Sequence, residues 1–263
     1  MIGTLSNFVP MILLALFWGL SPLPAQTSPP AGATNSSNSV VLVELFTSEG
    51  CSSCPPADAL LRQINGARTR AGQWIVGISE HVTYWNDLGW VDPYSSEIYT
   101  ARQYSYGNRF QLDSVYTPQM VIDGTEQIVG SDGNGLQRAL QKENSAPKIP
   151  LHILSATMAG GVLNVSFSVG ATDDGQQADI MAVLTDDFDR SNVGRGENSG
   201  RTLDHVSVAR SLTRVATVLS ATQKTVQVPL PASFASGSGG HHLILFAQTP
   251  GFGPVLGTDS KPI

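Results

Sequence analysis

The chain has few charged residues, very few cysteines and no cluster of basic residues. Of its 263 residues, 15 are lysine or arginine and 21 are aspartate or glutamate, which gives a formal net charge of −6. The absence of a basic patch argues against nucleic acid as a partner. No glycine-rich phosphate-binding loop is present, so the sequence indicates no cofactor. Hydrophobic residues make up 41% of the chain, which is enough to form a buried core.

The N-terminal residues are expected to lie outside the fold. An apolar run at residues 8–20 ("FVPMILLALFWGL") is followed by a small, polar, proline-rich stretch. This pattern is typical of a signal peptide, which we place at residues 1–25, with a flexible lead-in at residues 26–39. The run is shorter than the roughly 20 residues of a membrane-spanning helix, so an uncleaved anchor is the less favoured alternative. We expect a secreted or periplasmic protein that does not contact the membrane after signal cleavage.

The next part of the chain, residues 40–145, alternates between predicted strands and helices. Continuous β-branched runs indicate buried strands, and apolar residues three or four apart indicate helices. The predicted strands are residues 40–46, 73–79, 117–123 and 126–130, and the predicted helices are residues 55–68, 95–110 and 134–144. The order is β-α-β-α-β-β-α. The first strands should be parallel because helix-length crossovers join them, and a hairpin should end the unit.

The pattern changes in the second half of the chain. Alternating or β-branched runs separated by glycine, aspartate and serine indicate six or seven strands within residues 150–263. We predict a mainly-β, sandwich-like domain for this part. The expected architecture is therefore an α/β domain at residues 40–145 followed by a β-rich domain at residues 150–263.

Cys51 and Cys54 are the only cysteines, and they stand in "FTSEGCSSCPPADAL". They lie between a predicted strand and a predicted helix, where the helix amino terminus can stabilise a thiolate. Cys51 is the candidate attacking residue because it is nearer the exposed loop, and Cys54 is the candidate resolving residue. The alternative is a structural disulfide, but the chain-entropy model gives so short a ring only about 2 kcal/mol of stabilisation. We therefore favour a redox pair that closes as a Cys51–Cys54 disulfide.

A C-x-x-C pair after the first strand of such a unit resembles the thioredoxin fold. Thr117 and Pro118, in "VYTPQMVID", stand where thioredoxin-like proteins place a cis-proline, so the resemblance implies that they shape a groove for an extended substrate. It also implies that Glu44, in the first strand, is a buried proton acceptor for Cys54. An ordinary trans proline and an exposed glutamate are the alternatives. The Ser-Ser pair between the cysteines departs from thioredoxins, as do the two prolines that follow Cys54.

Four spaced motifs are similar to a family of secreted bacterial proteins of unknown function, the DUF1223 type. They are "VELFTSEGCSSCPPADALL", "HVTYWNDLGWVDPYSS", "YTPQMVIDG" and "GRGENSGRTLDHVSVARSL". The resemblance extends from about residue 40 to the C-terminus. It implies a thioredoxin-like domain followed by a β-rich domain, but no known reaction.

Two polar segments are candidates for the surroundings of the cysteines. Residues 79–93 leave the second parallel strand at the sheet edge that should also hold the cysteines. There His81 could act as a base or lower the pKa of the Cys51 thiol, and Tyr84 and Trp85 could bind substrate or cover the disulfide. The alternative is that the aromatic residues only pack and that His81 satisfies a loop carbonyl.

The second polar segment is residues 195–205, which are dense in charge for this protein. This segment could dock onto the cysteines, although a salt-bridge lock between the domains is favoured. His241 and His242 are adjacent in a strand and so face opposite sides. We interpret them as structural and assign no metal ligand.

The favoured hypothesis is an exported thiol–disulfide oxidoreductase that acts on protein or small-molecule thiols and disulfides. Two alternatives stay open. One is a copper(I) or zinc protein in which reduced Cys51 and Cys54 bind the metal together with His81 or His205. The other is a non-enzymatic binding module that keeps the fold. The sequence leaves the direction of electron flow and the oligomeric state open.

Overall fold

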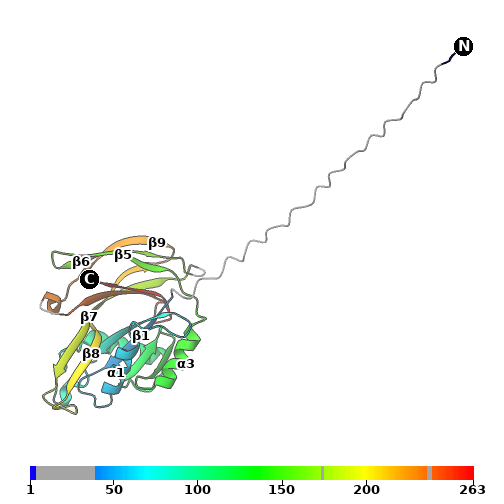
Figure 1. Ribbon diagram of the computed structural model, residues 1–263. Coiled ribbons are helices and arrows are strands. Elements are labelled where there is room, and N and C mark those ends of the chain that lie inside the picture. The colour runs from blue at the N-terminus through cyan, green and yellow to red at the C-terminus, as the bar shows by residue number, and fades with distance from the viewer. Residues whose placement is uncertain (4–38, 173–174, 236–238) are drawn as a thin grey trace. The chain divides into compact units, whose positions relative to one another are not determined.

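The structure, a computed structural model, describes residues 1–3, 39–172, 175–235 and 239–263 (Figure 1). The predicted lead-in, and all but the first three residues of the predicted signal peptide, lie outside the described residues, except for Ser39. The chain divides into two units, Met1–Thr34 and Asn35–Ile263, and every element below belongs to the second. No helix within the described ranges is long and apolar enough to cross a membrane.

The first seven main elements follow the predicted order. They are β1 (Val40–Thr47), α1 (Pro55–Ile64), β2 (Trp74–His81), α2 (Glu97–Arg109), β3 (Gln119–Ile122), β4 (Glu126–Val129) and α3 (Gly133–Glu143), with the short 3-10 helix η2 (Asn86–Leu88) before α2. β1 pairs in parallel with β2, as the crossover argument predicts. β3 runs antiparallel to both β1 and β4, so the predicted hairpin is present.

Local sequence signals explain where the helices begin. Prolines occupy the first positions of α1, where a missing backbone N–H costs nothing. The Ser96 side chain caps α2 by accepting a hydrogen bond from the Ile98 backbone N–H at 3.3 Å. Asp132 caps α3 in the same way, through the Gly135 N–H at 2.9 Å. These caps place the start of each helix beside the end of a strand.

The second half of the chain extends the same sheet. β7 (Ala178–Asn192), β8 (Thr202–Val218), β10 (His241–Gln248) and β11 (Val255–Pro262) give an eight-stranded sheet with the order β11-β10-β7-β8-β2-β1-β3-β4. β8 lies parallel to β2, with Ser79 opposite Val208. The remaining strands, β5 (Leu151–Ala159), β6 (Val162–Val169) and β9 (Thr222–Pro229), form a separate three-stranded antiparallel sheet, and η4 (Ala232–Ala235) follows β9.

This architecture shows that the predicted fold class is wrong. We predicted a thioredoxin-like α/β domain (β-α-β-α-β-β-α) followed by a β-sandwich-like domain. The described chain is instead mostly β, with three α-helices and one large mixed sheet to which both halves contribute strands. Hydrophobic alternation identifies strands by their buried faces, but it does not reveal which strand becomes a neighbour. Hydrophobic alternation therefore cannot predict the pairing of β8 with β2.

A buried ionic cluster lies on the α2 side of the sheet. The Arg102 guanidinium contacts Glu44 of β1 and lies 3.8 Å from the Glu80 carboxylate of β2. It also donates a hydrogen bond to the Tyr106 hydroxyl at 2.9 Å. Burial and the neighbouring Glu44 carboxylate raise the pKa of Glu80 well above its usual range. Arg102 is therefore the cation that compensates two buried acids.

Replacing Arg102 by leucine should destabilise the fold strongly. The change leaves the Glu44 carboxylate buried without its cation, which typically costs about 3–5 kcal/mol. Chemical denaturation at neutral pH measures this loss. Arg109→Leu, at the exposed end of the same helix, is the matched control and should change the unfolding free energy by only about 0.5 kcal/mol. Equal stability of the two variants would contradict the assigned role of Arg102.

Candidate functional site

Cys51 and Cys54 form a disulfide at the amino end of α1. Cys54 is the N-cap residue of this helix, yet its φ and ψ of −78° and −38° are already helical. Its carbonyl accepts hydrogen bonds from the N–H groups of Ala57 and Asp58 at 2.8 and 3.1 Å. The Cys51 sulfur lies 3.3 Å from the Ser53 hydroxyl. The strand–loop–helix order therefore places the pair at the positive end of the helix dipole, which favours a thiolate, and gives the Cys51 sulfur a neighbouring hydroxyl.

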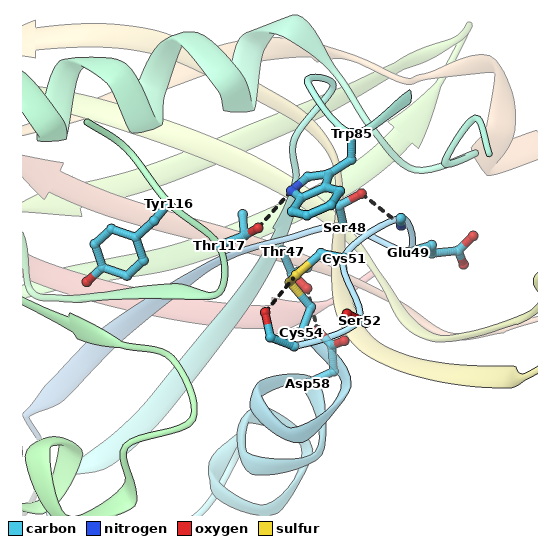
Figure 2. The surroundings of a disulfide bond; sticks show 12 residues. Thr47, Ser48, Glu49, Cys51, Ser52, Cys54, Asp58, Trp85, Tyr116 and Thr117 are labelled. Carbon is cyan, nitrogen blue, oxygen red and sulfur yellow. Dashed lines mark hydrogen bonds between the residues drawn. A yellow bond between two sulfur atoms is a disulfide. The ribbon is translucent and has the colours of Figure 1, made fainter. Parts of the chain in front are cut away.

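The disulfide is covered. Both cysteines have no exposed surface, although Ser52 and Ser53 between them are exposed. Figure 2 shows the Trp85 side chain over Cys51, with its indole N–H donating to the Thr117 hydroxyl at 2.8 Å. A Cβ added to Gly50 would lie 2.9 Å from the Trp85 Cβ. Trp85 is therefore packed directly on the cysteine loop and is held there by Thr117.

Pro118 lies beside the first turn of α1. The Thr117–Pro118 peptide bond is cis. A Cβ added to Gly130 would lie 3.0 Å from the Pro118 Cβ and 3.1 Å from the Ala57 Cβ, so Gly130 fits closely between the two. The structure thus brings Thr117, Pro118 and Trp85 together around the cysteines.

Glu44 lies elsewhere. Successive residues of a strand face opposite sides of the sheet. Val43 and Leu45 pack with Ala57 of α1, whereas Glu44 faces α2, where its carboxylate accepts a hydrogen bond from the Tyr106 hydroxyl at 2.7 Å. The structure does not bring Glu44 to Cys54, so the geometry gives no support to its expected role as the proton acceptor.

Tyr84 lies between Gln103 of α2 and Thr117. Its hydroxyl donates to the Gln103 side chain at 3.1 Å. Burial raises the pKa of Tyr84 to about 12, and hydrogen bonding with Thr117 and Gln103 partly opposes this shift. Tyr84 therefore supports Thr117 from behind and stays a neutral phenol.

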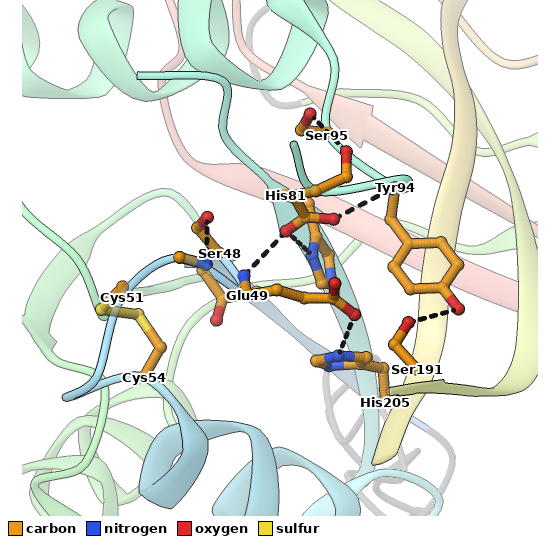
Figure 3. Close-up of polar contacts among 12 residues, drawn as sticks. Ser48, Glu49, Cys51, Cys54, His81, Tyr94, Ser95, Ser191 and His205 are labelled. Carbon is orange, nitrogen blue, oxygen red and sulfur yellow. Dashed lines mark hydrogen bonds and ion pairs between the residues drawn. A yellow bond between two sulfur atoms is a disulfide. The ribbon is translucent and has the colours of Figure 1, made fainter. Parts of the chain in front are cut away.

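Two histidines meet next to the cysteine loop (Figure 3). His81 ends β2 and His205 lies in β8, and their rings contact edge to face with centroids 4.7 Å apart. His81 Nδ1 lies 2.7 Å from Asp92 Oδ2. His205 Nε2 lies 3.2 Å from Glu49 Oε1, and its Nδ1 lies 3.9 Å from Asp58 Oδ2. These five buried residues are termed the histidine cluster. His81 thus bonds to Asp92, and its link to the cysteine loop passes through this carboxylate, which also accepts the Glu49 N–H at 2.8 Å.

The groups of the histidine cluster have different proton affinities. Burial alone would disfavour a charged His81, but the Asp92, Asp58 and Glu49 carboxylates outweigh burial and raise its pKa. Burial likewise opposes ionisation of Asp92, but the interaction with His81 lowers its pKa. These two residues therefore form an ion pair. Burial raises the pKa of Asp58, although His205 and His81 oppose the shift.

The loop between β7 and β8 docks onto the cysteine loop. The buried Asn198 side chain donates to the backbone carbonyls of Glu49 and Cys51, both at 2.9 Å. Glu197 accepts the Ser52 backbone N–H at 2.9 Å. Ion pairs also occur near this loop, because Asp204 contacts Arg190 at 2.6 Å and Arg62 at 3.9 Å. The segment therefore combines the docking contact and the salt bridges that the sequence left as alternatives.

His241 and His242 lie in β10 and contact two different carboxylates. His241 Nδ1 is 2.8 Å from Asp186, and His242 Nδ1 contacts Asp187. Within the described ranges, no group of three or more histidine, cysteine, aspartate or glutamate side chains is arranged to hold a metal ion. His81 and His205 contact carboxylates, which leaves the cysteine–histidine metal hypothesis without geometric support.

Sequence reasoning missed four residues of this site, which are Glu49, Asp58, Asp92 and Asn198. Asp58 follows Cys54 by one helical turn, so the predicted helix could have indicated it. Asn198 and Asp92 come from loops, and their contacts depend on how distant segments meet. No local pattern in the sequence predicts such contacts.

Comparison with known proteins identifies the family. Residues 42–248 match the model of a family described as a protein of unknown function, DUF1223. This chain belongs to the DUF1223 family. The prediction made from the four sequence motifs is thereby confirmed.

Solved structures include a similar protein. A crystal structure of a protein from Agrobacterium tumefaciens is 30% identical to this DUF1223 protein, with a TM-score of 0.62, and the match covers 84% of this chain and 92% of that one. OgpA from Akkermansia muciniphila is 8% identical, with a TM-score of 0.26 over 44% of this chain and 27% of that one. The second likeness is too weak to support an argument. No curated protein matches this chain.

Removing the Asn198 amide should loosen the cysteine loop. Asn198→Ala removes the side-chain donor of the Glu49 carbonyl and one of the two donors of the Cys51 carbonyl, which keeps the Cys54 N–H at 3.2 Å, and we expect a loss of unfolding free energy of about 1–3 kcal/mol. Denaturant titration measures the loss. Ser199→Ala changes the exposed neighbour in the same loop and should leave stability nearly unchanged. A neutral Asn198→Ala variant would show that this docking contact contributes little.

Proposed function

We propose that this protein is an exported thiol–disulfide oxidoreductase with Cys51 and Cys54 as its redox pair. The observation that carries the proposal is the position of the pair at the amino end of α1, with Cys54 already in helical conformation. Backbone amides at a helix amino end favour a thiolate and so lower the barrier to thiol–disulfide exchange.

A structural role explains the disulfide less well. A ring of this size contributes only about 2 kcal/mol in the chain-entropy model. The cysteine loop is already fixed by side chains, because Asp92 and Glu197 accept hydrogen bonds from its backbone N–H groups and Asn198 donates to its carbonyls. A staple at this point would add little to a loop that is held on both sides.

The reaction requires two exchange steps. In the reductive direction, a donor thiolate attacks the Cys51 sulfur, the Cys51–Cys54 bond breaks, and Cys54 leaves as a thiolate. A second thiol of the donor then attacks the mixed disulfide, and Cys51 leaves. The donor is oxidised to a disulfide, and the two electrons reside on the two reduced cysteines. The Ser53 hydroxyl, 3.3 Å from the Cys51 sulfur, is positioned to donate a hydrogen bond to the Cys51 thiolate.

Single-cysteine variants test this proposal. Cys54→Ser should accumulate a stable mixed disulfide between Cys51 and a thiol substrate, because the resolving thiol is missing. Cys51→Ser should accumulate none. Mass spectrometry after incubation with oxidised glutathione detects the adduct, and Ser53→Ala, which keeps both cysteines, should turn over without trapping. Equal labelling of the two cysteine variants would contradict the assigned roles.

Access to the buried disulfide should be controlled by Trp85. Trp85→Ala removes the side chain that packs on the cysteine loop, and we expect reduction by dithiothreitol to become about tenfold faster, equivalent to about 1.4 kcal/mol of lost opening cost. The rate is measured by stopping the reaction with acid at set times, removing the dithiothreitol and labelling the protein thiols with a thiol-reactive dye.

Trp74→Ala is the matched control, because Trp74 is 42% exposed and stacks on Arg68. Its rate should equal that of the parent protein. An unchanged rate for Trp85→Ala would mean that another group limits access.

A further inference from the structure

Asp58 links the cysteine helix to the histidine cluster. Cys54 and Asp58 are four residues apart in α1, and residues at this spacing are neighbours on one face of a helix. One Asp58 carboxyl oxygen accepts the Thr47 hydroxyl at 2.9 Å. The other lies 3.9 Å from His205 Nδ1. One oxygen is thus fixed by Thr47, and the other faces the imidazole.

Asp58 and His205 are close to each other but do not form a direct hydrogen bond. Their 3.9 Å separation exceeds a direct hydrogen bond. His205 Nδ1 has no hydrogen-bond partner among the described residues. Asp58 is 6% and His205 is 1% exposed, so solvent does not compensate for the missing bond. A small shift, or one bridging water, would complete a proton path between the two groups.

We propose that the Asp58–His205 pair exchanges protons with the Cys51–Cys54 couple, so that reduction of the disulfide is accompanied by proton uptake at this pair. The inference deepens the proposed function and rests on it in one respect, namely that the disulfide is reducible. Burial raises the pKa of Asp58, which favours proton uptake by its carboxyl.

The exchange chemistry fixes where the protons and electrons go. A dithiol donor supplies two electrons and becomes a disulfide, and its two thiol protons are released. One of the two released protons passes through the Asp58 carboxylate to the Cys54 thiolate, which becomes a thiol. Cys51 stays a thiolate, and the second released proton is taken up by the Asp58–His205 pair.

Other charged or titratable groups surround the pair, and they are the same groups in the oxidised and the reduced protein. They are Glu49 of the cysteine loop, His81 of β2, Asp92 and Tyr94 of the segment after β2, Asp189 of β7, Asp204 and Arg210 of β8, and Arg62 of α1. They set a constant background. A difference between the oxidised and reduced protein therefore reports the new charge on the sulfurs.

Carbon-13 NMR of the full chain tests the coupling directly. The side-chain carboxyl of Asp58 is titrated in the oxidised protein and in the protein reduced with dithiothreitol, with its signal assigned by loss in Asp58→Asn. We expect its midpoint to rise by about one pH unit on reduction, a tenfold gain in proton affinity. The exposed Asp113 should titrate identically in both forms. Identical Asp58 midpoints in the two forms would overturn the proposal.

Equilibration with dithiothreitol across pH 5 to 8 gives a second readout. Between the two Asp58 midpoints, reduction takes up an additional proton, so the reduction potential of the protein couple, after correction for the pH dependence of the dithiothreitol couple, should fall more steeply with rising pH in the parent than in Asp58→Asn. His205→Gln should also flatten the dependence. Thr47→Val, which removes a hydroxyl but keeps the carboxyl, should retain it. Equal slopes for Asp58→Asn and the parent would overturn the coupling.

The two proposals can fail separately. A redox-dependent Asp58 midpoint in a protein that turns over no disulfide would support the coupling and refute the oxidoreductase. Turnover with an unchanged midpoint would do the reverse. If Asp58→Asn does not fold, the Asp58 carboxyl signal is assigned through its connection to the Asp58 backbone resonances, and the comparison of the two forms of the parent protein decides the matter.

Discussion

The pairing of β8 with β2 is the constraint on which the candidate site depends. Neighbouring strands lie about 4.8 Å apart, so this pairing sets the His205 ring against His81. β8 begins directly after the loop that carries Asn198, and the same pairing therefore presses that loop onto the backbone of Cys51. The cysteines, Trp85 and most of the charged groups belong to the first half of the chain, and the second half adds Glu197, Asn198 and His205. A truncated first half would expose this cluster.

The sequence was informative wherever a feature depends on neighbouring residues. The apolar run at β1, the prolines of α1 and the Cys51–Cys54 spacing are local, and each predicted element in this region is present. The neighbour of β8 was not predictable, because alternation is the same whichever strand lies beside it. Asn198 was missed for the same reason, since its donors act on a loop about 150 positions earlier. The predicted division into an α/β unit and a sandwich failed at this long-range step.

Glu44 and Asp58 are two buried acids that lie on different sides of the sheet because one is in a strand and the other is in a helix. β1 is apolar almost throughout, so its hydrophobic pattern does not distinguish its two faces. Strand parity nevertheless places Glu44 opposite to Val43 and Leu45, and therefore away from α1. There it becomes one of the partners of Arg102. Asp58 reaches the cysteine side because helix periodicity, and not strand periodicity, governs its position relative to Cys54.

The complete burial of the disulfide imposes a condition on any reduced state. A helix amino end stabilises an anion by about 0.3–1 kcal/mol, rising to about 2 kcal/mol in favourable buried geometry. Transfer of a thiolate out of water costs more than this unless another group compensates it. Both cysteines have no exposed surface, so the compensation has to come from the protein. Asp58 of α1 and His205 are buried, and His205 Nδ1 has no hydrogen-bond partner among the described residues. A proton held at this pair offsets the thiolate charge without opening the site to solvent.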